Sequence, residues 1–163
     1  MTTFFEDFSV GDEEEFGEYD VTEDEILAFA EKYDPQWFHT DPERAAEESM
    51  YGGLIASGWH TTAMTMRMLV EEFLSESASL GAKGVDELRW RRPVRPGDTL
   101  SVRTEVLEKV EETPSRGLVR VRITTSNGDG EDVCSMVALT MFARRDGSGE
   151  GDENGENGAD GEE

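Results

Sequence analysis

One long apolar segment, residues 58–75, constrains the fold of this chain more than any other feature. Its large apolar side chains cover most of the circumference of a helix, which predicts a helix buried on several sides. These side chains belong to Trp59, Ala63, Met64, Met66, Met68, Leu69, Val70, Phe73 and Leu74. Such a helix needs a second layer that surrounds it, and the rest of the chain must supply that layer.

Alternation of apolar and polar residues follows the long helix and predicts strands. Residues 88–91 alternate Leu and Trp with arginine, and Leu100–Val106 alternates apolar with polar positions. A β-branched run at Leu118–Thr125 and an apolar run at Val133–Phe142 complete four strands, and Asn127–Gly130 between the last two predicts a hairpin. We predict an α+β domain in which the four strands form a meander wrapped on the helix.

The N-terminal half predicts a strand near Glu14–Glu18 and two shorter helices. Thr22 and Glu25 have the spacing of a capping box, with Thr22 as N-cap and the Glu25 side chain reaching back to it. Pro35 ends this helix, because the residue before a proline is disfavoured in the α region. Asp41-Pro42 then places an N-cap and a first-turn proline at the start of the next helix.

Two histidines are the candidates for acid–base chemistry. His39 follows Asp34 by five residues, in a loop beside a glycine-rich entrance to the long helix. Taken alone, this spacing fits either a catalytic pair or a surface histidine near a helix start. His60 lies inside the long helix, where we expect a packed histidine satisfied by the preceding turn.

The segment Tyr33–Pro42, followed by Gly53–Gly58, resembles the hydratase motif of the MaoC-like family, and Val94–Leu100 resembles a strand-turn-strand signature of that family. The resemblance extends over about residues 4–143. It implies a hotdog fold, an antiparallel sheet wrapped around a long central helix, over a domain of residues 1–145.

The resemblance also implies a hydro-lyase, an (R)-specific enoyl-CoA hydratase or dehydratase of fatty acid metabolism, with Asp34 and His39 as the catalytic pair. The two side chains would hold one water and exchange protons with it and with the α carbon. The backbone N–H of Gly58, at the start of the long helix, would meet negative charge that develops on the thioester oxygen, and a glycine there would let the substrate approach closely. The further residues expected at the substrate are Gly53, Leu54 and Ser57.

Three positions depart from the family pattern. Ser57 stands where the family often has histidine, Gln36 replaces a frequent asparagine, and Met66 or Thr65 stands where some (R)-specific hydratases carry serine. Two other functions therefore remain open: a hotdog acyl-CoA thioesterase, and a non-catalytic acyl-thioester-binding subunit in which Asp34 and His39 are structural.

The formal net charge of −23 excludes several classes of partner. Eight of these charges belong to the acids of residues 146–163, a segment without large apolar residues that we predict to be a disordered tail, which leaves −15 on residues 1–145. This charge argues against nucleic acid and anionic membranes as partners. The acidity and the ratio of twelve arginines to three lysines resemble proteins of salt-loving organisms.

Four arginines, Arg89, Arg91, Arg92 and Arg95, are clustered in this acidic chain. They are suited either to contact the phosphates of coenzyme A or to pair with carboxylates on the same sheet. Cys134 stands alone in an apolar run, so we expect a buried thiol, no intramolecular disulfide and no cysteine-based metal site.

The remaining expectations concern location and partners. The N-terminus lacks a signal-peptide pattern and no apolar run is long enough to span a membrane, so we expect a cytoplasmic protein. We expect an acyl-CoA substrate, no metal or redox cofactor, and a homodimer or higher homo-oligomer.

Overall fold

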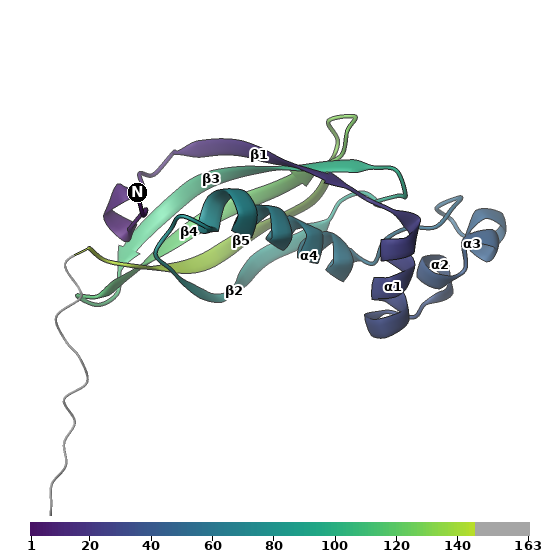
Figure 1. Ribbon diagram of the computed structural model, residues 1–163, viewed down its shortest axis with the longest axis horizontal. Helices are drawn as coiled ribbons and strands as arrows, with labels where there is room; N and C mark the ends of the chain where they lie inside the picture. The colour runs from purple at the N-terminus through teal and green to yellow at the C-terminus, as the bar shows by residue number, and fades with distance from the viewer. Residues whose placement is uncertain (146–163) are drawn as a thin grey trace, which may run out of the picture.

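One antiparallel sheet of five strands curls around a long helix in the computed structural model, which describes residues 1–145 (Figure 1). The sheet has the strand order β1-β3-β4-β5-β2. The strands are β1 (Glu13–Asp20), β2 (Ser79–Trp90), β3 (Thr99–Glu111), β4 (Arg116–Ser126) and β5 (Asp132–Ala143). This arrangement confirms the hotdog fold. The expected tail, residues 146–163, lies outside the described residues.

The predicted four-strand meander is only partly correct. Strands β3, β4 and β5 pair in sequence, and the Asn127–Gly130 hairpin joins the last two as expected. Strand β2, however, pairs with β5 at the opposite edge of the sheet. Because β1 and β4 flank β3 on both sides, β2 cannot pair with β3, its successor in the sequence, and it takes the free edge of β5 at the end of the sheet opposite β1.

The central helix occupies the predicted segment. It consists of α4 (Gly58–Leu69), continued by one π-helical turn, η2 (Val70–Leu74). Met64 and Met68 on α4 are each only 2% exposed and belong to the same core as the inward residues of the strands. One flank of the helix is uncovered, because Trp59 is 60% and Met66 47% exposed.

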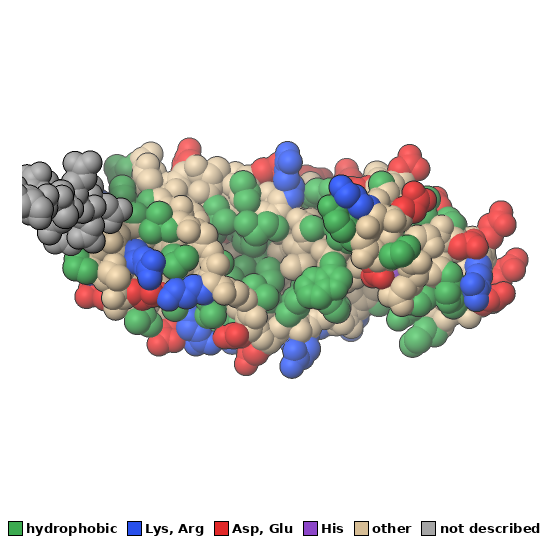
Figure 2. Space-filling view, turned by 90° about the horizontal axis from the view of Figure 1, so that it is seen from below, with side chains coloured by type: hydrophobic (Ala, Val, Ile, Leu, Met, Phe, Trp, Pro, Cys, Tyr) green, Lys and Arg blue, Asp and Glu red, His purple; other side chains and the backbone are tan. Residues whose placement is uncertain are grey.

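An exposed apolar surface extends from the uncovered flank of the central helix to strand β2. We call it the apolar edge surface. Its residues are Trp59, Met66, Val70, Leu80, Val85 and Trp90. Hydrophobic side chains gather in the middle of the face viewed in Figure 2, which looks at the molecule from the side where β2 lies in Figure 1. Large contiguous apolar surface of this kind is typical of a protein–protein interface.

Three short helices lie together beyond one end of the sheet: α1 (Glu23–Tyr33), α2 (Trp37–Thr40) and α3 (Pro42–Glu48) (Figure 1). The predicted N-caps are confirmed, since Thr22 accepts a hydrogen bond from the N–H of Glu25 and Asp41 from that of Arg44. The other half of the capping box is wrong, because the Glu25 carboxylate accepts from Tyr19 instead. No helix within residues 1–145 is long and apolar enough to cross a membrane.

Candidate active site

Asp34 and His39 meet at the end of α1. Asp34 is the C-cap of α1, with its N–H donating to the Ala30 carbonyl at 2.9 Å, and Pro35 follows it. The chain then turns into α2, which carries His39. As a result, His39 Nε2 lies 3.3 Å from Asp34 Oδ2.

A backbone carbonyl holds the His39 ring in place. His39 Nδ1 lies 2.7 Å from the Ile55 carbonyl oxygen, and this oxygen can only accept a hydrogen bond. The Nδ1 atom therefore carries a proton, and Nε2, the other nitrogen of the ring, is the one directed at Asp34. His39 is only 5% exposed, so the ring has little freedom to turn away.

Two side chains hold the Asp34 carboxylate. Ser57 Oγ donates to Oδ2 at 2.7 Å, and Gln36 Nε2 donates to Oδ1 at 2.7 Å. Burial raises the pKa of Asp34, but the hydrogen bonds from Ser57 and Gln36 and the charge of His39 outweigh burial and keep the pKa below its ordinary value. Asp34 is thus ionised at neutral pH and accepts hydrogen bonds.

The pair opens on a cavity of about 490 Å³. Asp34, His39, Ser57 and Gly58 line it, and aromatic and basic residues form other parts of its wall: Phe38, Tyr51, Trp59, Trp90, Arg91 and Arg92. The cavity therefore combines an acid–base pair with both apolar and cationic walls. Within residues 1–145, neither this cavity nor any other part of the structure groups three His, Cys, Asp or Glu side chains as metal ligands.

Gly58 begins helix α4 at the cavity wall. Ser57 is its N-cap residue, but the Ser57 hydroxyl bonds to Asp34 and does not cap the helix. The Gly58 N–H donates no hydrogen bond to any atom of the described residues. A side chain at position 58 would overlap the Trp90 indole ring, so the close approach at this glycine is made by Trp90.

The structure brings together four of the six predicted site residues: Asp34, His39, Ser57 and Gly58. Leu54 is 6% exposed and belongs to the hydrophobic core, and Gly53 lies beside Arg95 outside the cavity lining. Thr65 and Met66 are also outside the lining.

Sequence reasoning missed Trp90 and the Ile55 carbonyl. No sequence signal marks a carbonyl as a partner of histidine, and Trp90 is brought to Gly58 only by the pairing of β2.

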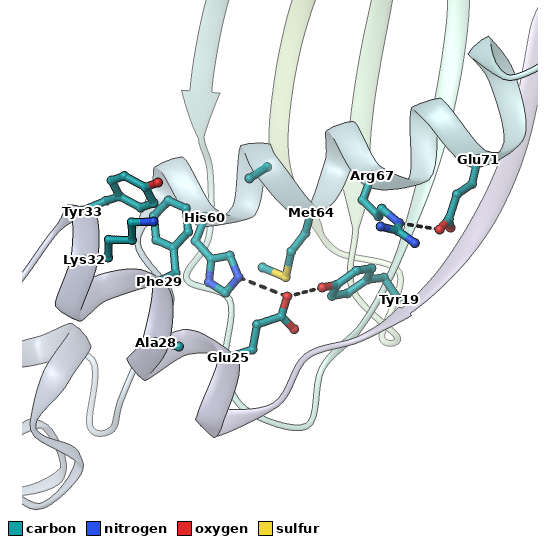
Figure 3. A pocket seen from close by; sticks show the side chains of 11 residues that line it. Tyr19, Glu25, Ala28, Phe29, Lys32, Tyr33, His60, Met64, Arg67 and Glu71 are labelled. Atoms are coloured by element: carbon teal, nitrogen blue, oxygen red, sulfur yellow. Dashed lines mark hydrogen bonds and ion pairs between the residues drawn. The ribbon is translucent and has the colours of Figure 1, made fainter.

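His60 belongs to a second polar cluster, shown in Figure 3. The Glu25 carboxylate lies between the Tyr19 hydroxyl, which donates to it, and His60 Nε2, which is 3.6 Å away. His60 is packed as expected, stacked on Phe29 with ring centroids 4.6 Å apart, but the preceding turn does not satisfy it, and its buried Nδ1 has no partner among the described residues.

The environment of this second cluster opposes charge on the histidine. Burial lowers the pKa of His60 more than Glu25 raises it, and burial together with the Glu25 hydrogen bond raises the pKa of Tyr19 to about 12. Neither Tyr19, Glu25 nor His60 lines the cavity at Asp34 and His39.

Comparisons with known proteins identify the family of the chain. The model of a family described as "MaoC like domain" matches residues 7–127. A MaoC-like dehydratase from Rhodospirillum rubrum has a crystal structure that is 41% identical and superimposes with a TM-score of 0.78, covering 87% of this chain and 97% of that one.

Two relatives whose names state an enzyme activity are more distant. An R-hydratase from Pseudomonas aeruginosa, solved without ligand, is 26% identical with a TM-score of 0.69, covering 87% of this chain and 86% of that one. The 3-hydroxyacyl-thioester dehydratase Z of Mycobacterium tuberculosis is 29% identical over 127 residues, which are 75% of this chain and 82% of the relative.

Proposed function

This chain belongs to the MaoC-like dehydratase family, and from that premise we propose that it adds water to, or removes it from, the α,β-double bond of an enoyl-CoA thioester. Distant relatives of the chain are hydro-lyases: the dehydratase of Mycobacterium tuberculosis and the R-hydratase of Pseudomonas aeruginosa. The observation that carries the proposal is the Asp34–His39 pair, held by Ser57 and Ile55 and open to a cavity.

Asp34 and His39 supply the acid–base chemistry. In hydration, one water lies against the carboxylate of Asp34 and Nε2 of His39, and both groups accept hydrogen bonds from it. Its oxygen bonds to the β carbon as the pair takes up one proton, and the pair returns a proton to the α carbon. The product has gained one hydroxyl and one hydrogen, so the pair ends each turnover in its starting state. Each group contributes about 10²- to 10⁴-fold to the rate.

The N-terminus of α4 supplies the electrostatic part. As the α,β-double bond opens, negative charge develops on the thioester oxygen. The free Gly58 N–H donates to this oxygen, and the positive end of the helix dipole adds to the stabilisation. This N–H is available because the Ser57 hydroxyl donates to Asp34 and does not cap the helix.

The enzyme acts as a homodimer in this proposal. The apolar edge surface combines the unpaired edge of β2 with the uncovered flank of the central helix. A second copy would cover both at once. Trp59 and Trp90 belong to this surface and also to the cavity wall, so dimerisation would complete the cavity.

Incubation with crotonyl-CoA tests the function directly. Hydration removes the absorbance of the enoyl thioester and leaves the thioester intact. A thioesterase instead releases free thiol, and a non-catalytic binding subunit does neither, so either result would overturn the proposal. Asp34→Asn protein serves as the matched control, because the substitution keeps the size of the side chain and removes its charge.

A further inference from the structure

The arginines of this acidic protein fall into two groups. Eight of the twelve form ion pairs with carboxylates, among them Arg92 with Glu131 at 3.0 Å and Arg122 with Glu105 at 2.9 Å. The other four have no carboxylate partner within residues 1–145, and these are Arg89, Arg91, Arg95 and Arg103. With 38 acids against 15 bases in the chain, four unpaired guanidinium groups are unexpected.

Three of the four unpaired arginines line one hollow. Arg89 lies on β2, Arg91 follows the last residue of that strand, and Arg103 lies on β3. Together with Arg92 and Arg122 they surround a hollow of about 540 Å³, which we call the arginine hollow. Neutral atoms are the partners of the first two: Arg89 donates to the Leu88 carbonyl and Arg91 to Ser135 Oγ.

Carboxylates in the hollow do not neutralise it. Glu87 and Asp132 are the acids of the lining; of its five guanidinium groups, those of Arg92 and Arg122 are paired with Glu131 and Glu105, and the other three have no carboxylate partner within residues 1–145. Asp132 accepts a hydrogen bond from Ser126 at 3.0 Å, and neither acid forms an ion pair with an arginine of the hollow. The hollow is therefore a cationic concavity on a molecule of strongly negative charge, and an anion is the ligand that such a field favours.

The arginine hollow adjoins the catalytic cavity. Arg91 and Arg92 line both, because they follow the end of β2 at Trp90, whose ring packs on Gly58. A ligand that fills both spaces would present its reactive group to Asp34 and His39 and an anionic group to Arg89 and Arg103.

We propose that the arginine hollow binds the phosphate groups of coenzyme A while the acyl thioester occupies the catalytic cavity. This inference rests on the proposed function and assigns the part of the protein that recognises the carrier of the acyl group. Guanidinium groups form paired, charge-assisted hydrogen bonds with phosphate oxygens and remain charged at every physiological pH.

A free nucleotide carrier fits the hollow better than an acyl carrier protein. The binding surface is concave and local, whereas the protein carries a formal charge of −15 on residues 1–145. An acyl carrier protein would have to contact the acidic surface around the hollow as well as the hollow itself. The phosphates of coenzyme A require only the hollow.

Single substitutions test the assignment without touching the catalytic cavity. Arg89→Gln and Arg103→Gln each remove one unpaired guanidinium of the hollow. Arg120→Gln is the matched control, because Arg120 lies on β4 outside the hollow and pairs with Glu108. Hydration of crotonyl-CoA is compared with hydration of crotonyl-pantetheine, which lacks the phosphates, at the lowest salt concentration that keeps the native circular dichroism.

The expected result separates KM from kcat. Arg89→Gln and Arg103→Gln raise the KM for crotonyl-CoA about tenfold with kcat unchanged, and leave the KM for crotonyl-pantetheine unaltered; Arg120→Gln changes neither. Binding of coenzyme A itself, measured by calorimetry, weakens by the same factor. This second readout still decides the proposal if the protein hydrates neither thioester, a result that would overturn only the proposed function.

Several outcomes would overturn the assignment. An equal rise in KM for crotonyl-CoA and for crotonyl-pantetheine would mean that the arginines maintain the structure of the site and do not bind the phosphates. Loss of activity with crotonyl-acyl carrier protein alone would identify the carrier protein as the partner. A changed oligomeric state in Arg89→Gln or Arg103→Gln protein would make the hollow part of an interface between copies.

Discussion

At the scale of single residues, the chemistry depends on how two side chains are held. Asp34→Asn and His39→Gln should each lower kcat for hydration about 10²-fold or more, because each removes one acid–base group while keeping its approximate size. The double variant should lose little beyond the worse single variant, since the two groups act on the same water. Steady-state hydration of a short enoyl-CoA measures all three.

His60→Gln is the control for this pair. His60 lies in the cluster with Glu25 and Tyr19, outside the cavity, so its substitution should leave kcat largely unchanged even where it lowers the melting temperature. Near-normal turnover in folded Asp34→Asn or His39→Gln protein would contradict the assignment and favour the binding-subunit or thioesterase function.

Ser57 adjusts the protonation of the pair. Its hydroxyl stabilises the ionised form of Asp34, so Ser57→Ala should raise the pKa of Asp34. The acidic limb of the kcat/KM profile should then move to higher pH, because the carboxylate becomes protonated earlier as the pH falls. The lost hydrogen bond to a charged, partly buried group should also cost about 1–3 kcal/mol of stability.

Ser75→Ala provides the comparison for Ser57, because Ser75 donates to the Glu71 carbonyl at the end of the central helix, and neither residue lines the cavity. An unshifted acidic limb in Ser57→Ala protein would mean that Asp34 is not the group whose ionisation limits activity.

At the scale of elements, strand β2 and the central helix form one surface. Val85 on β2 is 45% exposed on the open edge of the sheet, and we expect Val85→Lys to convert a dimer into a monomer, because it places a charge in an apolar interface. Light scattering coupled to size-exclusion chromatography measures the mass. Val110→Lys is the control: Val110 is 38% exposed on β3, outside the apolar edge surface. A wild-type protein that is already monomeric would refute the dimer.

At the scale of the whole molecule, charge governs the conditions of folding. With −15 on residues 1–145, carboxylates repel one another at low ionic strength, and salt relieves this repulsion by reducing the Debye length to about 3 Å near 1 M. We expect the melting temperature and activity to fall on dialysis from molar salt into dilute buffer, and to recover when salt is restored. Circular dichroism follows the first and crotonyl-CoA hydration the second. Full stability in dilute buffer would contradict a halophilic adaptation.

The amino-acid sequence alone determined the local features of this protein. Periodicity located the central helix, and Pro35 and Asp41-Pro42 fixed the helix ends that present Asp34 and His39. These features depend on interactions between residues close in the chain, which propensity and spacing record. The resemblance to the MaoC-like family added the hotdog fold and the assignment of the pair.

Only the tertiary structure decided which distant residues meet. The pairing of β2 with β5 placed Trp90 on Gly58 and the unpaired arginines next to the catalytic cavity. The direction of the Ser57 hydroxyl toward Asp34, and of Glu25 toward Tyr19, also followed from this packing. Such contacts join residues far apart in the chain, and a sheet with several open edges allows more than one pairing, so the choice depends on burying the whole core at once.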